Sequence, residues 1–142
     1  MPVSITAPYG ALLLRLTLGV MFLAHGLLKV FVFTLPGTVK FFAMLGYPAA
    51  LAYVVVGLEI LGGLALLTGL FTRTVSLALV PVLVGALLVH LHNGWLFSAA
   101  NGGWEFPALW IMLLLVQALV GPGAFALRLP GASRNSLAPS SI

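Results

Sequence analysis

The chain has 142 residues, of which 62% are hydrophobic and 6% are charged, and its net charge is +4. Soluble domains average roughly 45–50% apolar and about 25% charged residues, so this composition excludes an ordinary soluble domain and indicates one compact domain in a lipid bilayer. The six Lys and Arg residues are scattered, which predicts no nucleic-acid partner. The absence of cysteine excludes a disulfide framework, a thiolate metal site and a thiol–disulfide relay carried by this chain.

The first predicted membrane span covers residues 10–33. It is long enough to cross about 30 Å of hydrocarbon as a helix, and no basic residue precedes it, so we expect it to be retained rather than cleaved as a signal peptide. Arg15, His25 and Lys29 interrupt this span. A charge near the bilayer centre costs at least about 2.5–3.5 kcal/mol and is usually paired or lines a polar cavity, whereas Arg15, close to the end of the span, is expected to snorkel to the surface.

A short helix is predicted after the first span, over residues 38–45. Thr38 is placed to cap its N-terminus. Phe41, Phe42 and Leu45 would share one face of this helix, so we expect it to lie in the membrane interface.

Three further spans are predicted over residues 49–71, 75–92 and 104–119, which makes an all-α integral membrane four-helix bundle. The four spans form a single domain over residues 1–130. Residues 131–142 are rich in Ser, Ala and Pro and are predicted to form a flexible tail.

The distribution of basic residues predicts the orientation. An even number of spans puts both termini on one side of the membrane. Cytoplasmic loops carry an excess of Lys and Arg, so we expect both termini to be cytoplasmic, in the plasma (inner) membrane. The terminal side carries Arg15, Arg73, Arg128 and Arg134, and the opposite side carries Lys29 and Lys40.

Polar residues are predicted to meet inside the bundle. At about 1.5 Å per residue, Glu59 lies ~16 Å and His25 ~12 Å below the outer ends of their helices, which is close enough in depth for a hydrogen bond. Lys29 and His90 lie ~5–6 Å below the outer surface by the same rise. The sequence therefore predicts a polar funnel that opens outward, with Glu59 at its floor.

The outer loop before the last span supplies further candidate ligand-binding residues. Trp95 and Trp104 suit the aromatic belt at a membrane interface, and Asn93 is followed by a glycine that permits unusual backbone conformations. Glu105 is placed to accept hydrogen bonds from the free amides at the start of the last helix. We predict that these four residues, with Lys29 and His90, form the ligand-binding part of the site.

The ordered set of motifs over residues 10–127 resembles the DoxX family of small four-helix membrane proteins. The resemblance implies a four-helix membrane fold, and some relatives form part of a thiosulfate:quinone oxidoreductase. The motifs include Leu14-Arg15-Leu16, Phe22-Leu23-Ala24-His25-Gly26, Leu45-Gly46-Tyr47-Pro48, Glu59-Ile60-Leu61-Gly62-Gly63, Gly69-Leu70-Phe71-Thr72-Arg73, Asn93-Gly94-Trp95, Gly103-Trp104-Glu105-Phe106-Pro107 and Gly121-Pro122-Gly123.

With this resemblance, the first functional hypothesis is the membrane subunit of a quinone-linked redox system. Glu59 and His25 would be its catalytic residues, moving the proton that accompanies quinone reduction. The quinone would be the cofactor, and a soluble or membrane redox partner would supply electrons. A purely structural clasp between the two helices is the alternative for this pair.

Other functions stay open. The chain could be a non-catalytic anchor that recruits a partner through the Trp- and Gly-rich outer loop, or a carrier of a small solute or proton, which would need a homo-oligomer. No metal site is predicted. Convergence of His25, Glu59, His90 and Glu105 on a divalent cation is the weaker alternative.

Overall fold

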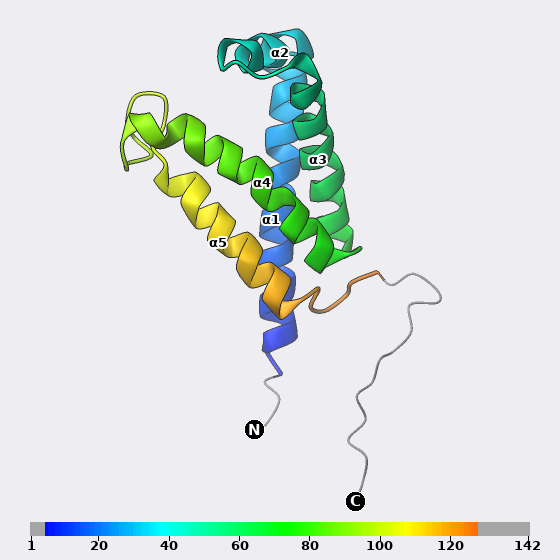
Figure 1. Cartoon of the computed structure of the whole chain (residues 1–142). Coiled ribbons are helices and arrows are strands. Elements are labelled where there is room, and N and C mark those ends of the chain that lie inside the picture. Colours follow the sequence, from blue (N-terminus) through cyan, green and yellow to red (C-terminus); the bar gives the residue numbers. More distant parts are fainter. Residues whose placement is uncertain (1–4, 128–142) are drawn as a thin grey trace, which may run out of the picture.

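The computed structural model describes residues 5–127, and every regular element in that range is helical. Arg128, Arg134 and the predicted tail over residues 131–142 lie outside the described residues. The elements follow the chain in the order α1 (Ala7–Phe31), α2 (Leu35–Met44), α3 (Ala49–Thr68), α4 (Thr72–His90), the short 3-10 helix η1 (Leu91–Asn93) and α5 (Glu105–Val120) (Figure 1).

The predicted spans are confirmed as helices, with ends that move by a few residues. Within residues 5–127, α1, α3 and the stretch from α4 through η1 are long and apolar enough to cross a membrane. The fourth predicted span, α5, is apolar but has only 16 residues, or about 24 Å at 1.5 Å per residue. The start of α1 and the end of α5 lie at one end of the bundle (Figure 1), which we call the inner end. The opposite end, which carries α2, is the outer end.

Two helix pairs build the bundle. The first pair, α1 and α3, runs side by side, and the second, α4 and α5, crosses it and diverges from it toward the outer end (Figure 1). A buried apolar cluster joins the pairs where they cross, and the van der Waals packing of such side chains helps membrane helices to associate. It contains Leu18, Phe22, Leu66, Leu79, Leu83 and Leu114.

Glycines bring α1 and α3 together. A Cβ atom built on Gly63 would lie 2.7 Å from the Leu23 nitrogen and 2.9 Å from the Gly19 oxygen, both on the backbone of α1. Small residues at such positions let membrane helices pack backbone to backbone. These glycines therefore form a contact between two helices of the same chain.

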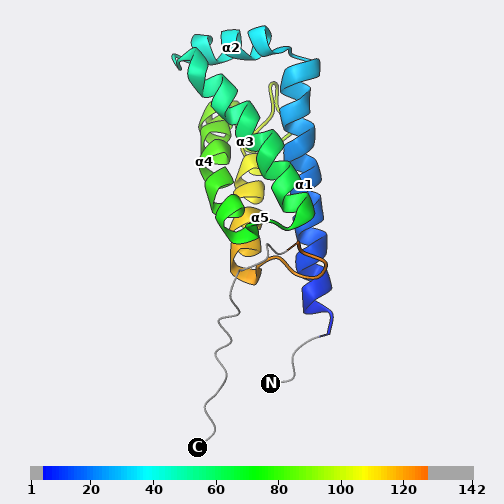
Figure 2. The same cartoon turned by 90° about the vertical axis from the view of Figure 1, so that its right-hand side faces the viewer.

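The helix α2 lies across the outer ends of α1 and α3 (Figures 1 and 2). The expectation that Thr38 caps it is wrong, because the helix begins one turn earlier. The cap is Thr34, at φ 63°, whose Oγ1 accepts from the Gly37 nitrogen at 3.3 Å. The Thr38 hydroxyl lies 3.0 Å from two carbonyl acceptors, Thr34 one turn back and Lys29 at the end of α1, and the second contact ties α2 to α1.

The segment over residues 121–127 folds back across the inner end of the bundle. Its Ala124 nitrogen donates to the Pro8 oxygen at 3.0 Å, and its Leu127 nitrogen donates to the Thr68 oxygen at 2.9 Å. Beneath it lies Arg15, which is only 1% exposed and donates from Nη2 to the Ala124 oxygen at 3.1 Å. The expectation that Arg15 snorkels to the surface is therefore wrong.

Candidate functional site

An ion pair between α1 and α3 forms the polar centre of the site. The Lys29 Nζ lies 2.8 Å from Oε1 and 2.7 Å from Oε2 of Glu59, with 20% of the lysine side chain and 7% of the glutamate side chain exposed. A Cβ atom built on Gly26 would lie 3.2 Å from the Glu59 Cβ, so the glutamate sits level with that glycine. From there the long, flexible stem of Lys29 reaches the carboxylate.

His25 lies beside this ion pair but does not make the hydrogen bond to Glu59 that helix depth predicted. Its Nδ1 instead donates to the Met21 carbonyl, one turn back on α1, at 2.9 Å. In a neutral ring this leaves Nε2 as a hydrogen-bond acceptor. The ring also stands edge-on to Trp110 of α5, with ring centroids 4.9 Å apart.

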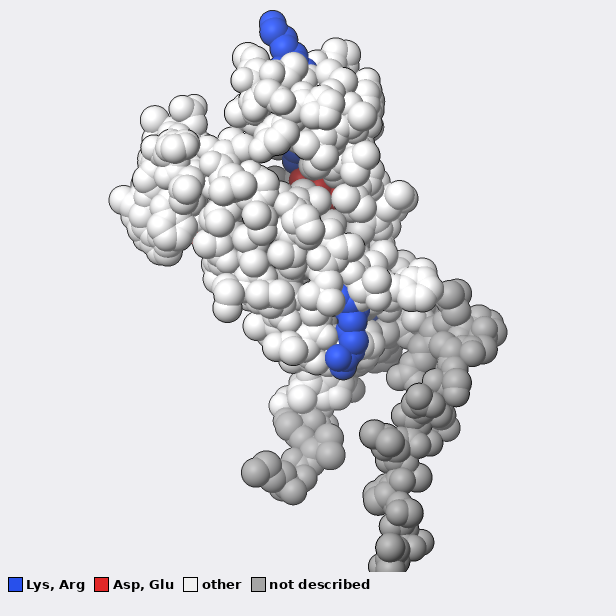
Figure 3. All heavy atoms as spheres, viewed as in Figure 1, with Lys and Arg blue, Asp and Glu red and all other residues white. Residues whose placement is uncertain are grey.

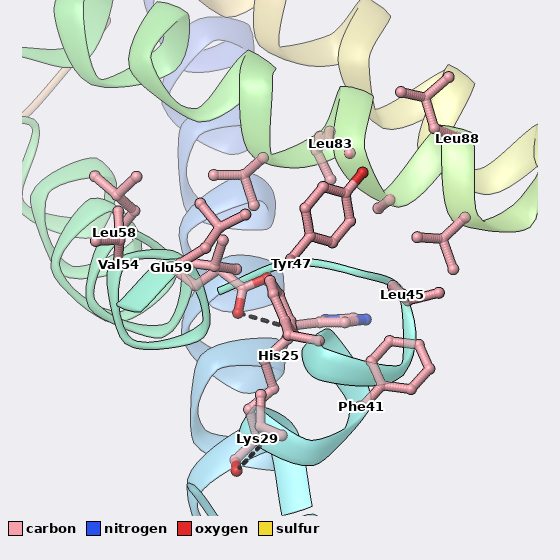
Figure 4. Close-up of a pocket in the computed structure, with 18 of the residues that line it drawn as sticks. His25, Lys29, Phe41, Leu45, Tyr47, Val54, Leu58, Glu59, Leu83 and Leu88 are labelled. Carbon is pink, nitrogen blue, oxygen red and sulfur yellow. Dashed lines mark hydrogen bonds and ion pairs between the residues drawn. The ribbon is translucent and has the colours of Figure 1, made fainter. Parts of the chain in front are cut away.

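A cavity of about 970 Å³ adjoins the ion pair. The Glu59 and Lys29 side chains lie on one side of this cavity, and the His25 ring is among the residues that line it (Figure 4). Most of the lining is apolar. It comes chiefly from α2, α3 and the outer half of α4, with Trp110 from α5, and its polar members are His25, Lys29, Thr38, Tyr47, Glu59 and His90.

The cavity has an opening on the side of the bundle. The predicted funnel opened toward the outer loops, but Thr38 and Phe41 of α2, with Leu45 directly after that helix, line the outer end of the cavity and cover it. In the space-filling view the charged pair is visible in a hollow between the mass of α2 above and that of α4 below (Figure 3). The expectation of an outward funnel fails because α2 packs across the bundle end instead of beside it.

This arrangement suits a ligand that dissolves in lipid and carries a polar head. Ligand pockets usually have volumes of roughly 300–1,000 Å³, with apolar walls and a few polar groups that fix orientation. Here Lys29 supplies N–H donors, and Glu59 and His25 supply acceptors or exchangeable protons. Mostly apolar walls lower the local dielectric constant, which strengthens electrostatic interactions at the polar centre.

His90 connects the cavity to the outer loop. Its ring lines the cavity, while its Nδ1 donates to the Gly102 carbonyl at 3.2 Å. Asn93 supports the same loop, because its Nδ2 donates to the Gly102 oxygen at 2.8 Å and to the Asn101 oxygen at 3.2 Å. Of the predicted ligand-binding residues, His90 thus joins Lys29 in the cavity, and Asn93 holds the loop in place.

The remaining predicted residues form a second, separate hollow of about 550 Å³. Trp95 and Trp104 pack edge to face there, with ring centroids 4.5 Å apart. Glu105 also lines it, but its Oε1 accepts from the Phe97 nitrogen of the loop at 2.8 Å. The expectation that Glu105 binds the amides of its own helix is therefore replaced by a bond that closes the loop onto α5.

Several cavity residues were missed by sequence reasoning. The shared face of α2 was recognised but assigned to the membrane interface, and Tyr47 and Trp110 gave no local signal of their position. Within residues 5–127, no three His, Cys, Asp or Glu side chains come close enough to hold a metal ion, so the weaker alternative of a cation site is not seen there.

Comparison with known proteins gives a consistent result. Residues 10–92 match the DoxX family. A Bacillus subtilis protein named "Putative oxidoreductase CatD" is 35% identical over 119 residues, which cover 83% of this chain and 84% of that protein. An uncharacterised protein of Haemophilus influenzae is 34% identical over 123 residues, covering 84% of this chain and 89% of that protein. No solved structure matches this chain.

Proposed function

Since this chain belongs to the DoxX family, we propose that it is the membrane subunit of a quinone-linked redox system and binds the quinone in the cavity beside Lys29 and Glu59. The observation that carries this proposal is an ion pair at the edge of a mostly apolar cavity between membrane helices. Ionisable residues within membrane spans are rare and usually mark a functional site. The name of the Bacillus subtilis relative points in the same direction.

The residues at the cavity have distinct roles in this proposal. A bound quinone accepts two electrons and two protons on reduction to the quinol. Lys29 would orient a carbonyl oxygen of the head group by donating a hydrogen bond, while Glu59 and His25 hold and release protons. The electrons come from a soluble reductant or a partner protein, since the chain has no cysteine to carry them as thiols.

We also propose which membrane the protein occupies and how it is oriented there. Six basic residues, four of them on the terminal side in the predicted topology, favour cytoplasmic termini in the plasma (inner) membrane. The cavity then lies in the half of the bilayer away from the cytoplasm. Proteolysis of a C-terminal tag in sealed membrane vesicles of known orientation tests this part independently.

Quinone bound to the purified protein tests the proposal directly. We would isolate the protein in mild detergent, extract it with organic solvent and measure quinone by mass spectrometry. We expect near-stoichiometric quinone in the unaltered protein and at least a tenfold loss in Glu59→Gln. Lys40→Gln, which removes an exposed charge outside the cavity lining, is the control and should keep its quinone. Equal traces in all three proteins would contradict the proposal.

A second candidate function is a non-catalytic anchor. It is favoured by the exposed aromatic residues of the outer hollow, where Trp95 and Phe106 remain about half exposed. In that case Trp95→Ala and Trp104→Ala should abolish capture of a partner, and Glu59→Gln should spare it. A complex that depends on Glu59 and tolerates both tryptophan changes would count against the anchor.

A further inference from the structure

The side opening of the cavity is bordered by apolar side chains of two helices. Val54 and Leu58 of α3 and Val84 and Leu88 of α4 line the cavity and are also exposed on the surface of the bundle. Such a surface on a membrane span is in contact with lipid chains, not water. The opening therefore connects the cavity to the hydrocarbon layer.

Polarity changes sharply along the path from this rim to the ion pair. The four residues named at the rim are all apolar. The far wall holds Glu59, whose side chain is only 7% exposed. At the inner end the path is closed by the apolar core, in which Phe22 and Leu66 are fully buried. A molecule in the cavity thus meets polar groups at one end and lipid at the other.

We infer that the cavity takes its ligand sideways from the bilayer, between α3 and α4, and that the ligand is an amphiphile whose polar head reaches Lys29 and Glu59 while its apolar tail stays in the opening. The identity of the head as a quinone rests on the proposed function. The route and the tail rest on the position of the opening alone.

A matched pair of glycines tests occupancy of the cavity. Gly85 of α4 lines the cavity, and Gly57 of α3 does not, yet a Cβ atom built on either meets nothing within 4 Å. Leu at either position should therefore be tolerated by the fold. We expect Gly85→Leu to weaken ligand binding at least tenfold and Gly57→Leu to leave it unchanged. Equal affinity in both variants would overturn the assignment of the ligand to this cavity.

Trp110 provides the reporter. Its ring lines the cavity, and replacing the other two tryptophans in Trp95→Phe/Trp104→Phe leaves it as the sole indole. Quinones quench tryptophan fluorescence, so binding can be followed in nanodiscs with a decyl-tailed quinone and with the same head group lacking the tail. With concentrations expressed per lipid, we expect the tailed probe to bind at least tenfold more tightly. Equal affinities would overturn the role of the tail.

A second matched pair tests the route. Leu88 and Leu77 lie on α4 and are each 53% exposed, but only Leu88 lines the cavity. In this cysteine-free chain, Leu88→Cys or Leu77→Cys can be labelled alone with a bulky maleimide before reconstitution. We expect the label at residue 88 to slow quenching at least tenfold relative to the label at residue 77. Identical rates would show that entry does not use this opening.

A lipid probe separates the inference from the proposed function. Phospholipid brominated on its acyl chains quenches indoles without any quinone head. Quenching of Trp110 by the brominated chains, reduced by the label at residue 88, together with no quinone binding would leave the route standing and reject the quinone. Quinone binding whose affinity does not depend on the tail and whose rate does not depend on the label at residue 88 would reject the route and support the quinone as ligand. Failure of both probes to reach Trp110 would overturn the route.

Discussion

The two ends of α1 each hold a cation, and the bundle treats them differently. At the outer end, Lys29 is paired with a carboxylate at the edge of an open cavity. At the inner end, Arg15 is almost fully buried and bonds a backbone carbonyl, while its Nε and Nη1 have no hydrogen-bond partner among the described residues. One helix can thus hold a cation in an ion pair at the edge of a cavity near one end and bury another cation under the chain near the other end.

Backbone contacts account for the difference. Near the inner end, Gly69 at φ +83° leaves room for the Arg15 guanidinium, and residues 121–127 close over it. Gly69 is the C-cap of α3, so the guanidinium lies beside the C-terminal end of that helix, and a helix C-terminus favours a nearby positive charge. The chain has two acidic residues in all, and Glu59 and Glu105 are both engaged near the outer end. Arg15 therefore relies on the Ala124 carbonyl and on the end of α3.

The largest expected effect comes from filling the close backbone contact between α1 and α3 at Gly63, which we call the seam. Gly63→Leu would drive a side chain into the backbone of α1, so we expect a loss of at least about 3 kcal/mol, near the upper end of typical overpacking costs. Thermal unfolding in detergent measures it, with Gly85→Leu as the control, expected within about 1 kcal/mol of the unaltered protein. Similar stability of both variants would break the contrast between a closed seam and an open cavity.

Breaking the ion pair should have the next largest effect. Lys29→Met leaves a buried carboxylate without its cation, and because the lysine is partly exposed we expect a loss of about 2–3 kcal/mol, below the 3–5 kcal/mol of fully buried pairs. Adding Glu59→Leu should recover most of that loss. A double-mutant cycle measures the coupling, and a double variant no more stable than Lys29→Met would show that the pair is not the source of the cost.

Removing the inner cation should matter less. Arg15→Met keeps much of the side-chain volume, deletes a buried unpaired charge and loses one bond to the Ala124 carbonyl, so these terms largely offset one another. We expect a change in unfolding free energy within about 1.5 kcal/mol. A loss as large as that in Lys29→Met would mean that Arg15 has a strong partner, and the contrast between the two ends would fail.

The smallest effect is expected in the outer loop. Glu105→Ala removes the acceptor of the Phe97 amide, and a single solvent-exposed hydrogen bond of this kind contributes about 0.5–1 kcal/mol, confined to local stability. Amide hydrogen exchange at Phe97 should accelerate, while exchange in α1 and α3 should stay the same. Acceleration throughout the bundle would show that the loop is coupled to the core more tightly than the structure indicates.

Much of the fold could be predicted from the sequence because hydropathy and span length are strong local signals. The partner of Glu59 could not, since depth along ideal helices ranked His25 above Lys29. The error has two physical causes: the rotamer of His25 directs Nδ1 to its own helix, and the lysine stem spans about one helical turn. Helix depth alone cannot represent either.

Two long-range features were also beyond the sequence. Burial of Arg15 depends on residues more than a hundred positions away, and the cover over the cavity depends on the angle at which α2 leaves α1. Local signals did exist for both. Gly69 and Gly121 mark backbone at positive φ, and the apolar face of α2 needed a partner. Those signals show that the backbone turns or that an apolar face must be covered, but they do not show which residues make the contact.

The short last helix has a consequence for the surrounding lipid. Helix α1 has 25 residues, or about 37 Å at 1.5 Å per residue, whereas α5 has 16 residues, or about 24 Å. The hydrocarbon layer is about 30 Å thick, so α1 exceeds it and α5 falls short of it within the same small protein. We expect the bilayer to thin locally beside α5 and α1 to tilt. Lipids with shorter acyl chains should match the length of α5 better than that of α1.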